Sequence, residues 1–256
     1  MQIPFTLTCS NYMAHVSNEF VDQKFVQSMQ SKRCFAAFAK LKADVRKKPI
    51  PKIDKDDLIY FQHDFKDYAK HDKVFNVDLK SAYATCLYNA GYISEETSNY
   101  LAKISKNDRL ASVGMLASKK KVFDFGKDGE PFHYEEHVSE LENFFYFAVQ
   151  QTHEIMSKLK AACGHNYLFT WVDGIYFIPD EEILSRCLYI LAEHKFNWSF
   201  DELTNFEVKP LGSYIKVTFD KDDKFKRFAI PTQQSQFRKL ASDVLISLNN
   251  KKQKSK

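Results

Sequence analysis

The order of apolar and polar positions along the chain predicts alternating helices and strands. Short aromatic and β-branched runs are typical of buried strands, and apolar residues recurring every three or four positions are typical of amphipathic helices. Helices that alternate with hairpin-spaced strands predict an α+β fold, in which helices pack on one face of an antiparallel sheet, with short helical extensions at both ends. The predicted strands cover 74–78, 119–125, 206–211, 214–219 and 225–230, and a hairpin over 167–178 has its tight turn at Asp173-Gly174. The predicted helices cover 19–42, 81–91, 94–115, 139–162, 181–194 and 233–248.

Local signals refine these boundaries. Ser94 is a plausible N-cap, and Gly164 follows the long helix as a C-cap. The Lys47–Pro51 stretch breaks the first helix and looks like a linker. We expect an N-terminal helical extension over 1–70, a central domain over 71–232 with an insertion at 91–118, and a final helix with a basic tail over 233–256.

Composition narrows the class of protein. An apolar content of 44% with 15% aromatics in 256 residues is enough for a hydrophobic core. The net charge of +4 permits a nucleic-acid partner without requiring one. Five scattered cysteines without a C-x-x-C pair favour neither a disulfide framework nor a zinc site, and no apolar run has the length of a membrane span. We therefore expect a soluble protein of the cytoplasm, a reducing compartment, without a membrane partner.

Two of the apolar runs each carry one aspartate at or near the end of a predicted strand. Asp78 ends the run that starts at Val74, and Asp173 lies in the run that starts at Tyr167. A carboxylate among apolar residues is costly to bury unless a cation or hydrogen-bond donors hold it. If neighbouring strands bring the two aspartates together, the carboxylates repel one another and favour a divalent metal between them.

Motifs around these aspartates resemble those of family-B DNA polymerases. The segment Asp78-Leu79-Lys80-Ser81-Ala82-Tyr83 resembles the first palm motif, D-x-x-S-L-Y-P, with alanine at the leucine and proline positions. The segment 170–177, T-W-V-D-G-I-Y-F, is similar to the D-T-D-S/G-I-F/Y motif. Asp173 falls on its second aspartate, and Trp171 stands where the first would be.

Two further segments follow the order of motifs in that family. Residues 106–114 resemble the finger-helix pattern K-x-x-x-N-S-x-Y-G, keeping the lysine and glycine but losing the Asn, Ser and Tyr. Residues 224–230 resemble the K-K-R-Y segment that steadies the primer end. The four matches span about residues 74 to 230.

The resemblance implies a reduced polymerase palm that adds nucleotides to a nucleic-acid or protein primer. Asp78 and Asp173 would be the catalytic residues and would bind two Mg²⁺ or Mn²⁺ ions. Such ions lie about 3.5–4 Å apart in nucleotidyl-transfer sites. The implied partners are DNA or primer-template nucleic acid and dNTPs. The chain has no room for an exonuclease domain and little for a thumb, which a partner subunit could supply; a phage or mobile-element origin would suit such a polymerase.

The same resemblance assigns the binding residues. Lys106 and Arg109 share one helix face and would hold the triphosphate, while Tyr83 would seat the sugar and exclude a 2′-hydroxyl. The implied nucleotide-binding set is Ser81, Tyr83, Lys106 and Arg109, and the implied nucleic-acid-binding set is Lys224, Lys226 and Arg227.

Simpler interpretations stay open for each residue. Asp78 could cap a helix, and Asp173-Gly174 could be only a hairpin turn. Tyr83 could belong to the core, and the basic residues could be solvated surface charges. At the level of function, the alternatives are a catalytically silent palm that binds nucleic acid or assembles with partners, and a metal-dependent nuclease that uses the same carboxylates.

Overall fold

The chain folds into two compact units that interleave along the sequence. The computed structural model describes residues 6–10, 14–16, 31–54, 58–64, 68–125, 131–212 and 214–231. Unit 1 comprises residues 1–56 and 81–149, and unit 2 comprises residues 57–80 and 150–256. The predicted helix over 233–248 and the first part of the one over 19–42 lie outside the described residues.

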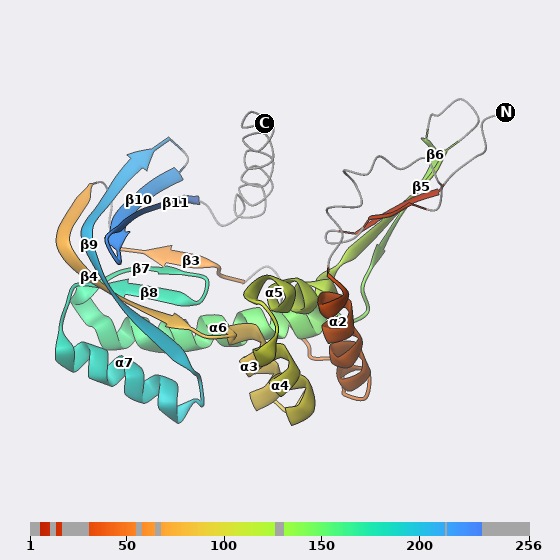
Figure 1. Ribbon diagram of the computed structural model, residues 1–256, viewed down its shortest axis with the longest axis horizontal. Coiled ribbons are helices and arrows are strands. Elements are labelled where there is room, and N and C mark those ends of the chain that lie inside the picture. Colours follow the sequence, from red (N-terminus) through yellow and green to blue (C-terminus); the bar gives the residue numbers. More distant parts are fainter. Residues whose placement is uncertain are drawn as a thin grey trace. The chain divides into compact units, whose positions relative to one another are not determined.

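Unit 2 is built on one antiparallel sheet, which curls in Figure 1. The strand order is β11-β10-β9-β4-β8-β7-β3, so the chain pairs β4 with β8 and β9, which come much later in the sequence. The strands are β3 (Phe61–His63), β4 (Ala69–Leu79), β7 (Tyr167–Trp171), β8 (Gly174–Phe177), β9 (Trp198–Leu211), β10 (Tyr214–Lys221) and β11 (Lys224–Pro231).

Two helices cover one face of this sheet. They are α6 (Glu142–Cys163), whose second half belongs to unit 2, and α7 (Glu181–Glu193). The free thiols of Cys163 on α6 and Cys187 on α7 contact each other, with their sulfur atoms 3.8 Å apart. Asp180 caps the start of α7 by accepting hydrogen bonds from the backbone N–H groups of Glu182 and Ile183. The predicted α+β class, with helices against an antiparallel sheet, is confirmed at this level.

The opposite face of the sheet packs against itself. Phe228 of β11 lies 6.0 Å from Phe169 and 6.1 Å from Trp171, both of β7, measured between ring centroids. Asn205 of β9 has a left-handed φ of 50°, and the register of β9 against β10 shifts beside it. A bulge of this kind bends a strand and increases its twist, which explains how the sheet closes over an apolar cluster of its own.

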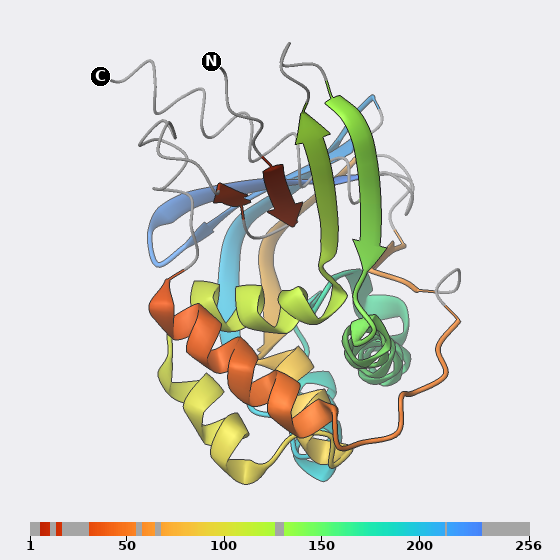
Figure 2. The same ribbon diagram turned by 90° about the vertical axis from the view of Figure 1, so that its right-hand side faces the viewer.

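The described part of unit 1 contains four complete helices, the first part of α6, a 3₁₀ helix and a second sheet. The helices are α2 (Lys32–Val45), α3 (Ala82–Asn89), α4 (Glu95–Lys103) and α5 (Lys106–Gly114), and the 3₁₀ helix η1 (Met115–Ala117) follows α5. Figure 2 shows α2 lying across α4 and α5. A second sheet has the order β2-β1-β5-β6, formed by β1 (Thr6–Ser10), β2 (Ala14–Val16), β5 (Lys119–Phe125) and β6 (Pro131–Val138).

Asp44 organises the helices of unit 1. Its carboxylate lies in the last turn of α2 and accepts hydrogen bonds from the Ser94 amide (2.8 Å), the Ser94 hydroxyl (2.7 Å) and the Thr97 hydroxyl (2.7 Å) at the start of α4. Ser94 in turn accepts a bond from the Thr97 amide, as its predicted capping role requires. An acidic group near the end of α2 is unfavourable to the dipole of that helix, but it is favourable at the beginning of α4.

Two sequence predictions need correction here. The helix predicted over 94–115 is two helices, because Ser105 caps a new one by accepting a hydrogen bond from the Asp108 amide. The strand predicted over 206–211 begins at Trp198. The predicted domain boundaries at residues 70 and 232 stay predictions. Each of the two compact units is made of two separate stretches of the chain.

Within the described part of the chain, no helix has the length and apolar character needed to cross a membrane.

Candidate functional site

Asp78 lies near the end of β4, on the face of the sheet that the helices leave uncovered. Side chains alternate along a strand, so Val74, Asn76 and Asp78 share one face. Val74 belongs to the apolar cluster on that face. Phe75, between them, turns to the other face, where its ring meets that of Phe177 at 5.9 Å. Asp78 is half-buried, which fits a carboxylate at the edge of an apolar surface.

Asp173 lies in the turn between β7 and β8, directly beside the end of β4. Asp78 is paired with Gly174 in the β4–β8 ladder, and the Leu79 amide donates a hydrogen bond to the Asp173 carbonyl at 2.8 Å. The two predicted catalytic residues therefore occupy neighbouring positions at one end of a strand pair. Whether they share a metal stays a prediction.

The turn itself differs from the prediction by one residue. Trp171 pairs with Gly174, so the turn residues are Val172 and Asp173 rather than Asp173 and Gly174. The Val172 amide donates to the Tyr60 carbonyl at 2.7 Å, which fixes the turn at this position together with the bond from Leu79. Val172 has a φ of 53°, a left-handed conformation that is unfavourable for a β-branched residue. A backbone constraint of this kind is typical of functional sites.

Gly174 leaves the space that the Asp78 carboxylate uses. A Cβ atom at position 174 would stand 3.0 Å from Oδ1 of Asp78 and 3.5 Å from Nδ2 of Asn76. The distance to Asn76 is an ordinary van der Waals contact, but the distance to Asp78 is shorter than one, so a side chain here would displace the carboxylate. The absence of a Cβ therefore lets Asp78 lie over the beginning of β8.

The Tyr176 phenol lies within electrostatic range of three carboxylates. Burial raises the pKa of its phenol well above the usual value, and the negative charges of Asp78, Asp173 and Asp201 raise it further. Tyr176 pairs with Asn76, which pairs on its other side with Asp201 of β9. The phenol therefore stays protonated throughout the neutral pH range and can donate its O–H.

Asn76, Asp201 and Lys221 were not identified from the sequence. Asn76 is buried, at 6% exposure, and its side-chain amide donates to the Ile175 carbonyl at 3.2 Å. Asp201 forms an ion pair with Lys221, with 2.6 Å between Oδ2 and Nζ. Asn76 could have been noticed, because a polar residue two positions before Asp78 shares its face. Asp201 could not, because nothing in the sequence pairs β9 with β4.

The donors at the end of β4 fit a hard divalent cation. Asp78 and Asp173 supply carboxylate oxygens from rigid elements, and Gly174 keeps the space beside one of them open. Among the described residues, no group of three or more histidine, cysteine, aspartate or glutamate side chains gathers closely enough to form a complete metal site. Mg²⁺ is commonly held by one or two carboxylates together with substrate phosphates, so two aspartates are compatible with it.

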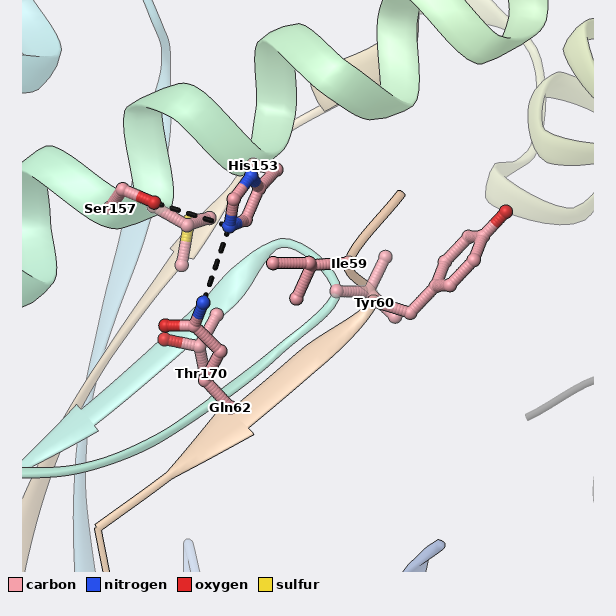
Figure 3. Close-up of a pocket in the computed structure, with 8 residues that line it drawn as sticks. Ile59, Tyr60, Gln62, His153, Ser157 and Thr170 are labelled. Carbon is pink, nitrogen blue, oxygen red and sulfur yellow. Dashed lines mark hydrogen bonds between the residues drawn. The ribbon is translucent and has the colours of Figure 1, made fainter. Parts of the chain in front are cut away.

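A small pocket lies beneath the Val172–Asp173 turn, on the helix side of the sheet (Figure 3). Figure 3 shows His153 of α6 and Gln62 of β3 pointing toward each other, with 3.3 Å between their nitrogens. The Ser157 hydroxyl lies 3.2 Å from the same ring nitrogen of His153. Burial lowers the pKa of His153, so its imidazole is neutral at pH 7. Val172 also lines the pocket, which therefore supports the turn from below.

The predicted nucleotide-binding residues all belong to unit 1. Ser81 has a left-handed φ of 59° at the start of α3 and forms no side-chain cap there. The Tyr83 ring meets Phe145 edge to face at 5.6 Å, a contact that agrees with the core interpretation. Lys106 is exposed at the first position of α5. Arg109 is half-buried, and its Nη1 donates to the Leu101 carbonyl at 3.2 Å, which gives it a structural role at the end of α4. Their roles toward a nucleotide stay predictions.

The predicted nucleic-acid-binding residues Lys224, Lys226 and Arg227 lie on β11 in unit 2, and all are exposed. Their contacts with a nucleic acid stay predictions.

No protein-family model matches this chain, and no curated protein sequence matches it either. The likeness to family-B polymerases therefore depends on the four motifs and on the positions that their residues take in the fold.

Proposed function

We propose that this protein is a metal-dependent nucleotidyltransferase with a palm-type sheet resembling a minimal family-B DNA polymerase. The observation that carries the proposal is the pairing of Asp78 with Gly174, which sets the first aspartate beside the Asp173 turn. The two motifs are far apart in the sequence, and the resemblance requires their aspartates to be neighbours in space. A fold in which β4 and β8 were not neighbours would have made the resemblance meaningless.

In this proposal, Asp78 and Asp173 hold Mg²⁺ or Mn²⁺. The metal would activate an attacking hydroxyl and neutralise the leaving phosphate. Asn76 and Gly174 position the Asp78 carboxylate, one by holding the β8 backbone and the other by leaving room. The Tyr176 phenol stays protonated beside the carboxylates and is a hydrogen-bond donor rather than a further anion.

The substrates would be dNTPs and a primer end on DNA, RNA or protein. Lys106, Arg109, Ser81 and Tyr83 remain the proposed nucleotide contacts, and a partner subunit remains a proposed source of a thumb. The basic residues of β11 would contact the primer strand through salt-sensitive phosphate contacts.

Primer extension tests the proposal directly. The assay uses each dNTP singly and all together, with and without template, in Mg²⁺, in Mn²⁺ and in EDTA. We expect metal-dependent incorporation that Asp78→Asn and Asp173→Asn each reduce by more than about 100-fold, since even outer residues of metal sites cost about 10–100-fold. Asp222→Asn is the matched control, because it removes one carboxylate from an exposed turn of the same unit. Incorporation that survives both substitutions would contradict the proposal.

A silent nucleic-acid-binding palm is the second candidate, and Trp171 favours it. Trp171 stands at a motif position usually held by aspartate, and it stacks on Phe228, with both rings packed against the apolar cluster. Calorimetric titration with Mn²⁺ distinguishes the two candidates. Equal Mn²⁺ binding by the wild type and Asp78→Ala, with no polymer in any template context, would establish the silent palm. Degradation of labelled DNA without incorporation would instead establish a nuclease.

A further inference from the structure

Two cysteines of unit 2 meet between the helices that cover its sheet. Cys163 is the last residue of α6, and Cys187 lies in the middle of α7, 24 residues further along the chain. Their sulfur atoms are 3.8 Å apart, and both cysteines are free thiols. Cys187 lies between Ile183 and Leu191 on the buried face of α7, at helical spacing, so it stands at the centre of the surface that this helix buries.

Cys34 of unit 1 is a close match to these cysteines in every respect but the chemistry of its neighbour. Cys34, Cys163 and Cys187 are each at most 1% exposed. The sulfur of Cys34 also lies 3.8 Å from a second sulfur, which is the thioether of Met115. A thioether has no proton to lose and cannot form a disulfide. The Cys163–Cys187 pair therefore has a possible reaction that the Cys34–Met115 pair lacks.

The Cys163–Cys187 pair favours one thiolate. Either thiol can donate the hydrogen bond between the two sulfur atoms. This bond raises the pKa of Cys163 and lowers the pKa of Cys187, which the positive charge of Arg186 lowers further. Burial instead raises the pKa of Cys34. Because the thiolate is the reactive form of cysteine, Cys187 is the thiol of the pair that an oxidant attacks first.

Both the distance and the burial of the pair restrict the reaction. A disulfide bond is about 2.05 Å long, so the two sulfur atoms need to approach each other by only about 1.8 Å. A bulky oxidant cannot reach thiols that are buried between two helices. Hydrogen peroxide is close to water in size and is the kind of oxidant that such a site admits.

We propose that Cys163 and Cys187 form a site of reversible oxidation by a small peroxide, where a disulfide closes and locks α7 to the end of α6. The inference goes beyond the proposed function and does not depend on it. The lock acts on a part of unit 2 that is already tied to the sheet. Shortly after Cys163, the Asn166 carbonyl accepts a hydrogen bond from the Ile178 amide at the end of β8, with a length of 2.8 Å.

The reaction has two steps. The Cys187 thiolate attacks one peroxide oxygen, the O–O bond breaks, and the sulfur becomes a sulfenic acid while hydroxide leaves. The Cys163 sulfur then attacks the Cys187 sulfur, the S–O bond breaks, and a second hydroxide leaves. The two thiol protons convert the hydroxides to water. Two thiols and one hydrogen peroxide therefore give one disulfide and two water molecules, and a thiol reductant reverses the change.

Mass spectrometry of the wild-type full chain tests the inference. The reduced protein is treated with a few equivalents of hydrogen peroxide, quenched with catalase and digested without reduction by trypsin, which cuts between the two cysteines at Arg186. We expect a cross-linked pair of peptides that contain Cys163 and Cys187, two hydrogen atoms lighter than their sum. Dithiothreitol should separate them.

Thermal unfolding measures the lock itself. We expect the unfolding midpoint of the oxidised protein to lie about 5 °C above that of the same sample after treatment with dithiothreitol, because the bond restricts the unfolded chain. Oxidised methionines survive this treatment, so they do not contribute to the difference. Cys34→Ala is the matched control and should keep both the cross-link and the rise, whereas Cys163→Ala and Cys187→Ala should each abolish both.

The first measurements use the wild type, so they do not depend on whether a variant folds. A sulfinic acid at Cys187 without a cross-link would overturn the inference, and so would a disulfide that joins two chains. A cross-linked protein whose unfolding midpoint does not rise would overturn the lock. None of these outcomes involves nucleotide incorporation or metal binding, so the proposed function stands or falls separately.

Discussion

The two units use aspartate in opposite ways. In unit 1, Asp44 accepts three hydrogen bonds from Ser94 and Thr97. Burial alone would raise the pKa of Asp44, but these bonds outweigh it and lower the pKa below the usual value. In unit 2, burial raises the pKa of the Tyr176 phenol, and the charges of Asp78, Asp173 and Asp201 raise it further. Asp44 is held by three hydrogen bonds from neighbouring residues, whereas Asp78, Asp173 and Asp201 place three negative charges around one phenol, with Asp201 also paired with Lys221.

This difference separates a structural acid from a candidate catalytic one. A carboxylate whose ionised form is stabilised by the fold adds to the stability of that fold. Carboxylates gathered on one surface destabilise the fold slightly, and such an arrangement is characteristic of functional sites. The comparison therefore predicts that removing an acid has opposite effects on stability in the two units.

The largest effect on stability is expected for Asp44→Ala. The substitution removes the acceptor of three hydrogen bonds between α2 and α4, and bonds to a charged group contribute about 1.5–3 kcal/mol each at most. We expect the free energy of unfolding to fall by about 2 kcal/mol, because water can replace part of the loss at this exposed edge. Urea unfolding measures the change, and hydrogen exchange of the α4 amides locates it in unit 1. Unchanged Mn²⁺ binding by the variant is the internal control.

The same variant carries a pH signature. The folded-state pKa of Asp44 is lowered, so its stabilisation is present above the unfolded-state pKa of about 4 and is lost as the pH falls through the folded-state value. Wild-type stability should therefore fall more steeply than that of Asp44→Ala between about pH 5 and pH 2. Parallel curves for the two proteins would show that Asp44 has no structural role.

Asp78→Asn should change stability in the other direction. Removing one of the carboxylates near Tyr176 relieves repulsion, so we expect the free energy of unfolding to stay level or to rise by up to about 1 kcal/mol. Mn²⁺ binding, followed by calorimetry, should disappear. A loss of stability as large as that of Asp44→Ala would instead make Asp78 a structural acid, in agreement with the helix-capping interpretation.

Much of unit 2 could be predicted from its sequence, because its strands follow the rules of periodicity. The run that ends at Asp78 and the hairpin that contains Asp173 are apolar and β-branched, and both form as predicted. What failed was local geometry. The Asp173-Gly174 dipeptide predicts a turn, yet hydrogen bonds from Leu79 and Val172 place the turn one residue earlier.

Contacts between distant segments were beyond reach for a physical reason. Residues 198–205 mix polar and apolar positions, so the first half of β9 has no strand pattern of its own, and its pairing with β4 is what makes it a strand. Asp201 and its partner Lys221 enter the site only through that pairing. The break after Lys103 was missed because apolar spacing continues through it, while Ser105 starts a new helix.

A smaller effect is expected for Gly174→Ala. The added Cβ would meet Oδ1 of Asp78 at 3.0 Å, and this atom is the movable end of a side chain, so the carboxylate should turn away. We expect stability to change by less than about 1 kcal/mol, below the usual cost of overpacking, and Mn²⁺ affinity to fall about tenfold. Gly212→Ala serves as the control, because Gly212 also lies in a turn of unit 2 and nothing stands within 4 Å of its Cβ position. The control carries backbone strain of its own, since Gly212 has a φ of 60°, and it should lose stability without losing metal affinity.

The smallest effect should come from Val172→Gly. Glycine removes a left-handed strain of about 1–2 kcal/mol and restores the residue that this kind of turn favours. It also adds about 0.5–1 kcal/mol of chain entropy to the unfolded state and loses the packing of Val172 on the pocket. These terms nearly cancel, so stability should change by less than about 1 kcal/mol. The turn that carries Asp173 becomes freer, however, and Mn²⁺ affinity should fall several-fold. Val172→Asn, which tolerates a positive φ and keeps a Cβ, should retain more of that affinity than glycine does. If glycine and asparagine bind Mn²⁺ as tightly as valine, the strained turn does not aim Asp173, and the rigidity of unit 2 at this point serves only the fold.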